Sequence, residues 1–137
     1  MSTDLGAAKG AKPRELIHFV TQQTRFALIN NILQHPKQLP SMYELEELNP
    51  SVSDATVYKH TQKLIDAGIV NEVALEDDQR RQGYPWKFYG LTEEGRDFLE
   101  EHNLLAAEET LQQIYETISD KPEKMVKYEN VPRPDET

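Results

Sequence analysis

Apolar residues recur at three- and four-residue steps in the first third of the chain, the period of a helix buried on one face. The pattern begins at Lys12, Pro13 suits a first helical turn, and Pro36 ends it. Its β-branched and polar middle, Val20 to Thr24, disfavours one continuous helix. The spacing therefore predicts a long helix over 12–35, with a break into two helices as the alternative.

Two shorter helical patterns follow, separated by the turn-forming sequence NPSVS. The first covers residues 41–48, where Ser41 is a candidate N-cap and Glu44 its capping-box partner. Ser53 can cap the second, and Gly68 is the expected left-handed stop after it. This stretch predicts a short helix, a tight turn and a longer helix.

From Ile69 the apolar period changes from helical to two, which is typical of a half-buried strand. The polar sequence EDDQRRQGYP follows, and WKFYGL predicts a second short strand. Two strands joined in this way form a hairpin with a long tip. Thr92 is positioned to cap a further helix through EEGRDFLEEHNL.

The most regular apolar pattern lies near the C-terminus, with intervals of 3, 4, 3 and 4 residues. It consists of Leu104, Ala107, Leu111, Ile114 and Ile118. A narrow stripe on an otherwise polar helix is typical of a helix that pairs with another helix. We expect a homodimer built from this helix and the N-terminal helix, since two-fold dimers are the commonest oligomers. Closure of the monomer's own core is the alternative.

The order helix, helix, turn, helix, strand, loop, strand, helix resembles the winged helix-turn-helix transcription regulators of bacteria and archaea. SVSDATVYKHTQKLIDAGIV and WKFYGLTEEGRDFL carry the resemblance, which covers residues 24–99. The segment YGLTEEGRDFL is similar to the PadR and MarR types, and the ArsR type is also similar. With the acidic composition, the resemblance extends to a haloarchaeal regulator of the RosR type.

The expected fold class is mainly α with a small β-hairpin wing: a winged helix-turn-helix flanked by N- and C-terminal dimerisation helices. At 137 residues the chain has room for one modest core. The expected divisions are a disordered arm (1–12), the winged helix-turn-helix domain (13–103), a dimerisation helix (104–119) and a polar C-terminal tail (120–137).

The resemblance implies a homodimer that binds a double-stranded DNA operator, with the recognition helix in the major groove. The candidate residues of this helix are Ser53, Asp54, Ala55, Thr56, Tyr58, Lys59, His60, Gln62 and Lys63. An ordinary charged surface helix is the alternative. A winged helix that binds only other proteins is a second alternative.

The tip of the hairpin is expected to touch the minor groove or the phosphates. Its candidate DNA-binding residues are Gln79, Arg80, Arg81 and Gln82. Alternatively, the two arginines pair with the neighbouring Asp77 and Asp78 in a solvated loop. The aromatic residues are expected to pack the hairpin; they are Tyr84, Trp86 and Phe88.

The chain carries a formal charge of −9, whereas nucleic-acid binders usually show a basic footprint. Residues 1–91 hold 10 Lys and Arg against 11 Asp and Glu, a net of −1, while residues 92–137 hold 5 against 13, a net of −8. We therefore expect the acid to lie on the dimer helices, away from a near-neutral DNA face. In molar salt, where the Debye length is about 3 Å, the remaining repulsion is largely screened.

Several other classes of protein are disfavoured. The chain has no cysteine, which excludes disulfides and thiolate metal sites. No apolar run approaches the roughly 18 residues of a membrane span, and the four histidines are dispersed. We find no nucleophile motif or phosphate-binding glycine loop. We expect a cytoplasmic non-enzyme without cofactor, catalytic residues, metal or membrane partner; an effector or bound ions stay open.

Overall fold

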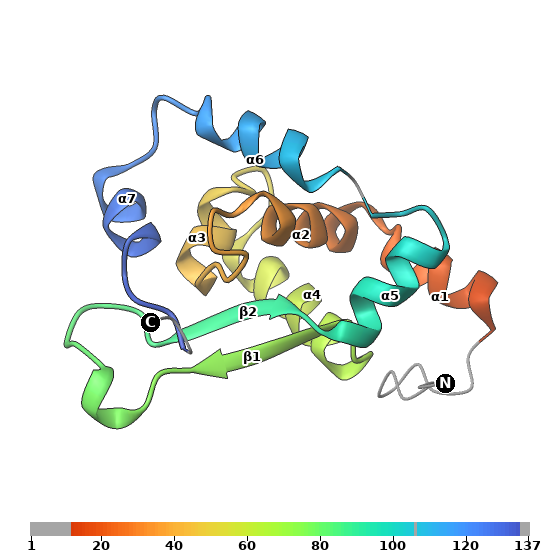
Figure 1. The fold of residues 1–137 in the computed structure, drawn as a ribbon, viewed down its shortest axis with the longest axis horizontal. Coiled ribbons are helices and arrows are strands. Elements are labelled where there is room, and N and C mark those ends of the chain that lie inside the picture. Colours follow the sequence, from red (N-terminus) through yellow and green to blue (C-terminus); the bar gives the residue numbers. More distant parts are fainter. Residues whose placement is uncertain (1–11, 106, 135–137) are drawn as a thin grey trace.

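The computed structural model describes residues 12–105 and 107–134 (Figure 1). Its elements are α1 (Pro13–Val20), α2 (Gln23–Gln34), α3 (Met42–Glu47), α4 (Asp54–Asp66), β1 (Val70–Ala74), a 3-10 turn (Asp77–Gln79), β2 (Lys87–Leu91), α5 (Glu93–Glu101), α6 (Glu108–Glu116) and α7 (Glu123–Glu129). The fold is mainly helical with one β-hairpin, as predicted. Apart from Lys12, the predicted disordered arm, 1–12, lies outside the described residues.

The N-terminal helical pattern is divided between α1 and α2, so the alternative with two helices is confirmed. Side chains at the break satisfy backbone groups of both helices. The Thr21 hydroxyl donates to the Ile17 carbonyl at 2.7 Å, and the Gln22 side chain accepts from the Arg25 amide at 2.9 Å. These local bonds compete with a continuous helical ladder, which explains the break.

Helix α2 forms the centre of the core. It contacts α4 on one side and α6 on the other (Figure 1). Its apolar face is at most 2% exposed and consists of Leu28, Ile29, Ile32 and Leu33. Residues from α1, α4, β1, β2 and α5 join the same cluster. The helix-turn-helix segment and the hairpin are therefore fixed to one common core.

The hairpin is a two-stranded antiparallel sheet in which Val70 pairs with Leu91 and Ala74 with Lys87. The Tyr89 amide also donates to the Pro40 carbonyl at 2.9 Å, which holds the segment before α3 against β2. A Cβ at Gly90 would lie 2.7 Å from the Leu39 side chain, so this close approach favours glycine. The start of α3 and the hairpin are thus directly connected.

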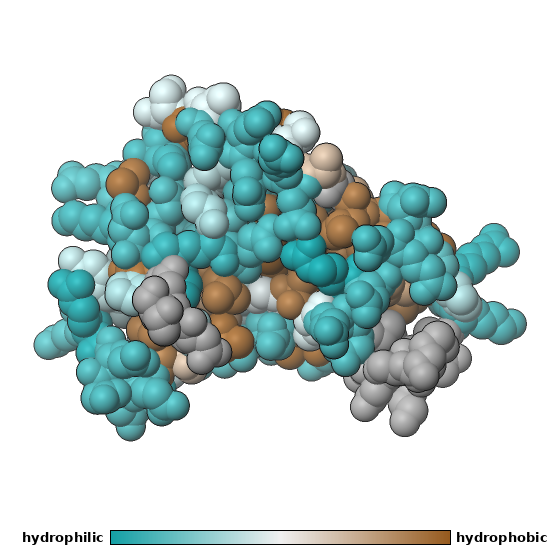
Figure 2. All heavy atoms as spheres, in the orientation of Figure 1, coloured by the Kyte–Doolittle hydropathy of each residue, from teal (hydrophilic) through white to brown (hydrophobic). Residues whose placement is uncertain are grey.

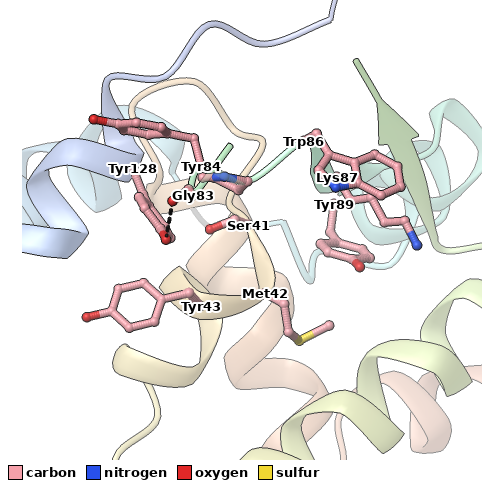
Figure 3. Close-up of a pocket in the computed structure, with 10 residues that line it drawn as sticks. Ser41, Met42, Tyr43, Gly83, Tyr84, Trp86, Lys87, Tyr89 and Tyr128 are labelled. Atoms are coloured by element: carbon pink, nitrogen blue, oxygen red, sulfur yellow. Dashed lines mark hydrogen bonds between the residues drawn. The ribbon is translucent and has the colours of Figure 1, made fainter. Parts of the chain in front are cut away.

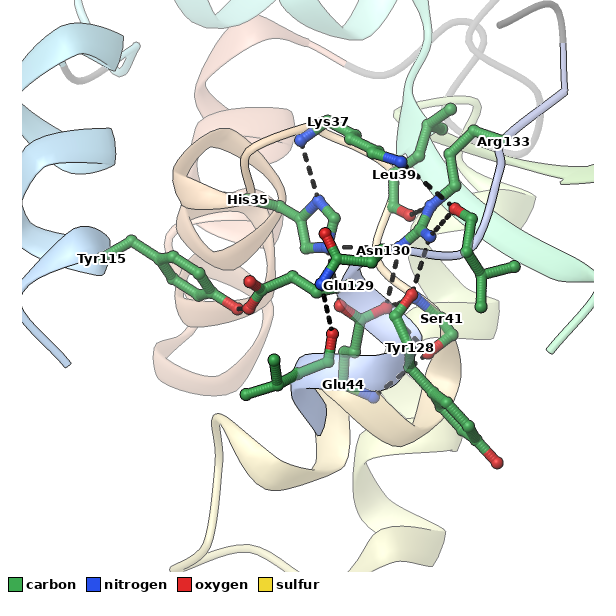
Figure 4. A network of polar contacts seen from close by, with 12 residues as sticks. His35, Lys37, Leu39, Ser41, Glu44, Tyr115, Tyr128, Glu129, Asn130 and Arg133 are labelled. Carbon is green, nitrogen blue, oxygen red and sulfur yellow. Dashed lines mark hydrogen bonds and ion pairs between the residues drawn. The ribbon is translucent and has the colours of Figure 1, made fainter. Parts of the chain in front are cut away.

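A buried polar network joins α2, α3 and the C-terminal segment (Figure 4). The fully buried Glu44 carboxylate lies 2.7 Å from His35 Nε2 and 3.0 Å from Arg133 Nη2. It also accepts from the Ser41 amide and hydroxyl, at 2.9 and 3.0 Å. The predicted capping box of Ser41 and Glu44 is therefore confirmed, and the same carboxylate also serves as a long-range anchor.

The Arg133 guanidinium saturates its remaining hydrogen-bonding capacity on backbone carbonyls. The acceptors are Leu39, Tyr128 and Val131, at distances of 2.6–2.9 Å. The guanidinium carbon also lies 4.3 Å from the centre of the Phe88 ring. A buried charge needs this density of partners, because its desolvation is otherwise strongly unfavourable.

Burial by itself raises the pKa of the Glu44 carboxyl, but the His35 hydrogen bond and charge, the Ser41 bond and the Arg133 charge together outweigh it. The net pKa lies below the usual value. The folded state therefore favours the ionised carboxyl. This stabilisation is present above the pKa of the unfolded chain and is lost as the pH falls through the lower folded pKa.

The C-terminal third differs from the prediction. Helix α6 begins at Glu108, not Leu104, because the Leu104 amide donates to the Leu99 carbonyl at 2.7 Å and ends α5. The buried residue of α6 is Tyr115, which lies outside the predicted stripe, whereas Ile114 is 51% exposed. Tyr115 packs against the His35 ring and donates to Glu129 at 2.6 Å. Burial of a large aromatic ring sets the orientation of α6.

The segment expected as a polar tail contains α7, with Met125 and Val131 buried. Arg133 and the hydrogen bond from Tyr115 to Glu129, at 2.6 Å, hold it against the rest of the chain. Among the described residues, the structure has no helix of sufficient length and apolar character to cross a membrane.

Replacing Arg133 by Ala should lower the free energy of unfolding by about 3–5 kcal/mol, because it leaves a buried carboxylate without one of its charged partners. Urea denaturation measures this loss. Lys127→Ala is the control, since the exposed Lys127–Glu123 pair at 3.7 Å should contribute less than about 0.5 kcal/mol. Equal, small effects of the two substitutions would contradict the role of the network.

Candidate nucleic-acid interface

Helix α4 begins with the predicted cap. The Ser53 side chain accepts from the Thr56 amide at 3.2 Å, and its hydroxyl donates to the Thr56 hydroxyl at 2.9 Å. Asp54 occupies the first turn, where a negative charge complements the helix dipole. Gly68, with φ 78°, ends the segment in the left-handed region, as predicted. Local chemistry therefore defines both ends of this helix.

The turn between α3 and α4 is fixed by a buried side chain. Asn49 donates to the Asn31 side chain at 2.7 Å and to the Leu45 carbonyl at 2.8 Å. On α4, Val57, Thr61 and Leu64 are buried against the core. These contacts set the angle of α4 relative to α2 and leave its opposite face open.

The predicted recognition residues lie on this open face or at its edges. Exposed are Ser53, Asp54, Ala55, Tyr58, Lys59 and Lys63, and partly buried are Thr56, His60 and Gln62. Ala55, Lys59 and Lys63 are four residues apart, which places them on one line along the helix. Tyr58 is 54% exposed, unusual for a large aromatic residue.

Beside α4, the hairpin carries a second polar edge. The Tyr89 hydroxyl donates to the Glu72 carboxylate at 3.3 Å, and Lys87 lies 3.9 Å from the same carboxylate. Burial, with the Glu72 charge and hydrogen bond, raises the Tyr89 pKa to about 12. The phenol is therefore a hydrogen-bond donor at neutral pH, and the Glu72 carboxylate is its acceptor.

The hairpin tip exposes Gln79, Arg80, Arg81 and Gln82. The Arg80 guanidinium is engaged, because it lies 3.6 Å from the centre of the Trp86 ring and Nε donates to the Leu75 carbonyl at 3.0 Å. It also pairs with Asp77 at 3.1 Å, as the alternative interpretation expected. Arg81 has a looser contact, 4.4 Å from the Tyr84 ring centre.

One solved structure is similar to the whole arrangement. It is a protein with a GntR superfamily winged helix-turn-helix domain from Halomicrobium mukohataei, with a TM-score of 0.81 and 25% sequence identity. The match covers 91% of this chain and 87% of that one. No protein-family model and no curated protein matches the chain.

The chain has a winged helix-turn-helix fold. Helices α3 and α4 form its helix-turn-helix unit, with α4 at the recognition-helix position, and the β1–β2 hairpin is the wing. Such a fold is typical of DNA-binding regulators. The similarity supports a winged helix-turn-helix regulator without selecting the PadR, MarR, ArsR or RosR type.

The wing aromatics pack as predicted. Phe88 is fully buried in a second cluster with Leu75 and Val131, and Tyr84 and Trp86 pack against that cluster. An open cavity of about 430 Å³ separates α3 from the wing and α7 (Figure 3). Tyr128 closes one side, donating to the Gly83 carbonyl at 3.1 Å. Aromatic packing thus holds the wing against α7 and the C-terminal segment, next to α3.

Sequence reasoning missed Arg25, which lies in the first turn of α2. Its Nη1 is 3.1 Å from His60 Nδ1, which places a guanidinium group from α2 at the edge of the recognition helix. Burial and the charges of Arg25, Lys63 and Lys59 lower the His60 pKa. No periodicity marks Arg25 in the sequence, and only its charge distinguishes it from its neighbours.

Among residues 12–105 and 107–134, no group of three or more His, Asp or Glu side chains is placed to hold a metal ion. The His35–Glu44–Arg133 network is fully engaged in structural contacts. The arrangement therefore offers a polar and cationic surface for binding.

Arg80 is predicted to stabilise the wing. Arg80→Lys keeps the charge but loses the Nε bond to Leu75 and weakens the stacking on Trp86. The free energy of unfolding should fall by about 1 kcal/mol, measured by urea denaturation. Arg81→Lys is the matched control and should change it by less than about 0.5 kcal/mol. A larger effect of Arg81→Lys would reverse the two assignments.

Proposed function

We propose that this chain is a homodimeric, sequence-specific DNA-binding transcription regulator whose recognition helix α4 enters the major groove. The observation that carries the proposal is the open face of α4. Within the described part of the chain, neither Lys59 nor Lys63 forms an ion pair, and both are exposed. Unpaired lysines on the exposed face of a recognition helix are suited to phosphates and guanine bases.

The N-terminal residues of α4 are proposed to lie nearest the base edges, as in other recognition helices. The methyl groups of Ala55 and Thr56 suit the thymine methyl, and Tyr58 and Gln62 offer donors along the wing-side edge. Ser53 caps the helix, so its contribution to DNA includes orienting the first turn. Asp54 would face cytosine, the base that presents an amino donor.

In the wing, Arg81 is the proposed minor-groove or phosphate contact, flanked by Gln79 and Gln82. Arg80 is proposed to act mainly by stiffening the tip through Trp86, because most of its donors have partners within the hairpin. Its exposed edge, 34% of the side chain, leaves room for a phosphate.

The acidic third of the chain is compatible with DNA because of where it folds. Helix α6 covers α2 on the side away from α4 (Figure 1). Some carboxylates of the acidic third are neutralised by nearby cations: Glu108 pairs with Arg96 at 2.6 Å, and Glu129 pairs with Lys121. We infer that the recognition face stays near neutral or cationic. This arrangement suits a halophilic archaeal protein, such as the source of the similar structure.

The dimer is proposed to use α1 and the segment from Leu104 to Ile118. Figure 2 shows hydrophobic atoms on the right of the view, where the α5–α6 linker passes α1 and α2. Leu104 and Leu111 also pack on the monomer core, while Ala107 and Ile114 are exposed. A two-fold dimer would place two copies of α4 about 34 Å apart, one turn of DNA.

The resemblance to the PadR, MarR and ArsR types, the cytoplasmic location and an effector are kept as predictions. The alternative function is a winged helix that binds only proteins. In that case Lys59, Lys63 and Arg81 would be dispensable for function, because they would be ordinary surface charges.

Selection of genomic DNA fragments with the purified protein at high salt should enrich a defined operator. On that operator, the double variant Lys59→Gln/Lys63→Gln should bind at least about tenfold more weakly, since each lysine contact contributes on the order of 1 kcal/mol. Gel shifts measure the dissociation constants. Lys124→Gln/Lys127→Gln removes the same charge from α7 as the control. Unchanged binding by the α4 variant would favour the protein-binding alternative.

Ile114→Glu should shift the protein from dimer to monomer without unfolding it, because Ile114 is the exposed large aliphatic member of the apolar stripe. Light scattering after gel filtration measures the mass. Val126→Glu is the matched control, since Val126 is also an exposed aliphatic residue, 41%, but lies on α7. A dimer that survives Ile114→Glu and dissociates with Val126→Glu would move the interface to α7.

A further inference from the structure

Arg25 forms a rigid unit with its neighbours at the edge of the recognition helix. Its Nε donates to the Phe19 carbonyl at 2.7 Å, and its guanidinium carbon lies 4.2 Å from the centre of the Phe19 ring. Nη1 reaches His60 Nδ1 at 3.1 Å. Three contacts hold a side chain that is only partly buried, so its position is set before any ligand binds.

The guanidinium retains donors for a ligand. Arginine carries five N–H groups in a planar fork, and the contacts to Phe19 and His60 use one Nε and one Nη hydrogen. The fork geometry matches the oxygens of a phosphodiester. Because Arg25 donates to Nδ1, neutral His60 carries its proton on Nε2, which adds a second donor.

Arg25 and the wing lie on opposite sides of α4. Tyr58 is on the wing side, because it is one of the groups close enough to Tyr89 of β2 to raise the pKa of that phenol. His60 is two residues further on, about 200° around the helix, and meets Arg25 from α2. The line of Ala55, Lys59 and Lys63 runs between these two edges.

Among the described residues, the charged groups that lower the pKa of His60 are all cations. Lys59 and Lys63 act on it together with Arg25, and no carboxylate is among the charged groups that perturb it. This is a cationic patch in a chain of net charge −9. Helix α2 also begins there, and its N-terminal amides add a partial positive charge.

We propose that Arg25 binds a phosphate of the DNA backbone on the side of the recognition helix opposite the wing, with His60 and Lys63 beside it. The inference rests on the proposed DNA-binding function and deepens it. A helix in the major groove lies between two phosphate backbones, about 12 Å apart. The wing reaches one of them; Arg25 reaches the other. The two contacts together fix the depth and tilt of α4.

The test compares Arg25→Gln with Lys127→Gln, which removes the same charge from an exposed position on α7, outside the proposed DNA and dimer surfaces. Gel shifts use the selected operator and an unrelated duplex at one salt concentration. Arg25→Gln should weaken binding to both duplexes by about tenfold, because a phosphate contact carries no sequence information. Lys127→Gln should change neither appreciably.

Ethylation interference then locates the contact. With the wild-type protein, ethylating the phosphate that Arg25 grips should block binding. With Arg25→Gln, ethylation of that one phosphate in each half-site should no longer affect binding, whereas ethylation of the phosphates next to the wing should still block it. If Arg25→Gln instead abolished the interference at the phosphates next to the wing, the proposed position of Arg25 on the DNA would be wrong.

Thermal unfolding of each variant separates a contact from a folding defect. If Arg25→Gln does not fold, Arg25→Lys is used, which keeps the charge beside the phosphate; retained affinity supports the proposal, and affinity that falls in step with the melting temperature overturns it. Equal losses from Lys127→Gln and Arg25→Gln would also overturn it, because they would indicate a bulk charge effect. Wild-type protein that binds no DNA refutes the proposed function itself, whereas wild-type binding that Arg25→Gln leaves unchanged refutes only this inference.

Discussion

The Glu44 carboxylate is the constraint on which the arrangement of this molecule depends. It is fully buried, yet the hydrogen bonds from His35 and Ser41 and the charges of His35 and Arg133 favour its ionised form. A buried charge is tolerated only where every partner is in place. The carboxylate therefore admits one relative placement of the end of α2, the start of α3 and the C-terminal segment, and any displacement of these elements leaves charges unsatisfied.

That placement extends to both parts of the candidate interface. The segment before α3 bonds through Pro40 to Tyr89 of the wing, and α3 continues into the turn that Asn49 locks onto α2. The wing and the recognition helix are thus positioned from the two ends of one short stretch. An interface that must grip two DNA backbones at once depends on this rigidity, since small errors in geometry weaken several contacts together.

Local chemistry made much of the fold predictable. Ser41, Ser53 and Thr92 cap the helices that follow them, and Gly68 adopts the left-handed conformation. The missed features depend on distant partners: Arg133 lies 89 positions from Glu44, and Arg25 lies 35 from His60. The aliphatic stripe near the C-terminus was a regular pattern, but burial of Tyr115 beside His35 took precedence in orienting α6. The exposed face of α4 could be predicted from the periodicity of its sequence. The residues from other elements that lie beside that face could not.

Net charge is a poor guide to binding in such a chain, because what matters is the potential at one surface. Two of the nearby carboxylates are engaged elsewhere, since Glu72 accepts from Tyr89 and Glu44 is enclosed, while Asp54 stays exposed in the first turn of α4. Cations on that face lack such partners or, like Arg25, keep donors free after bonding. The field there is then set by a few nearby groups, since distant charges are screened within about 8–10 Å at moderate salt and closer still in molar salt. An acidic protein can in this way present a cationic edge, and the pairing of its carboxylates decides where that edge lies.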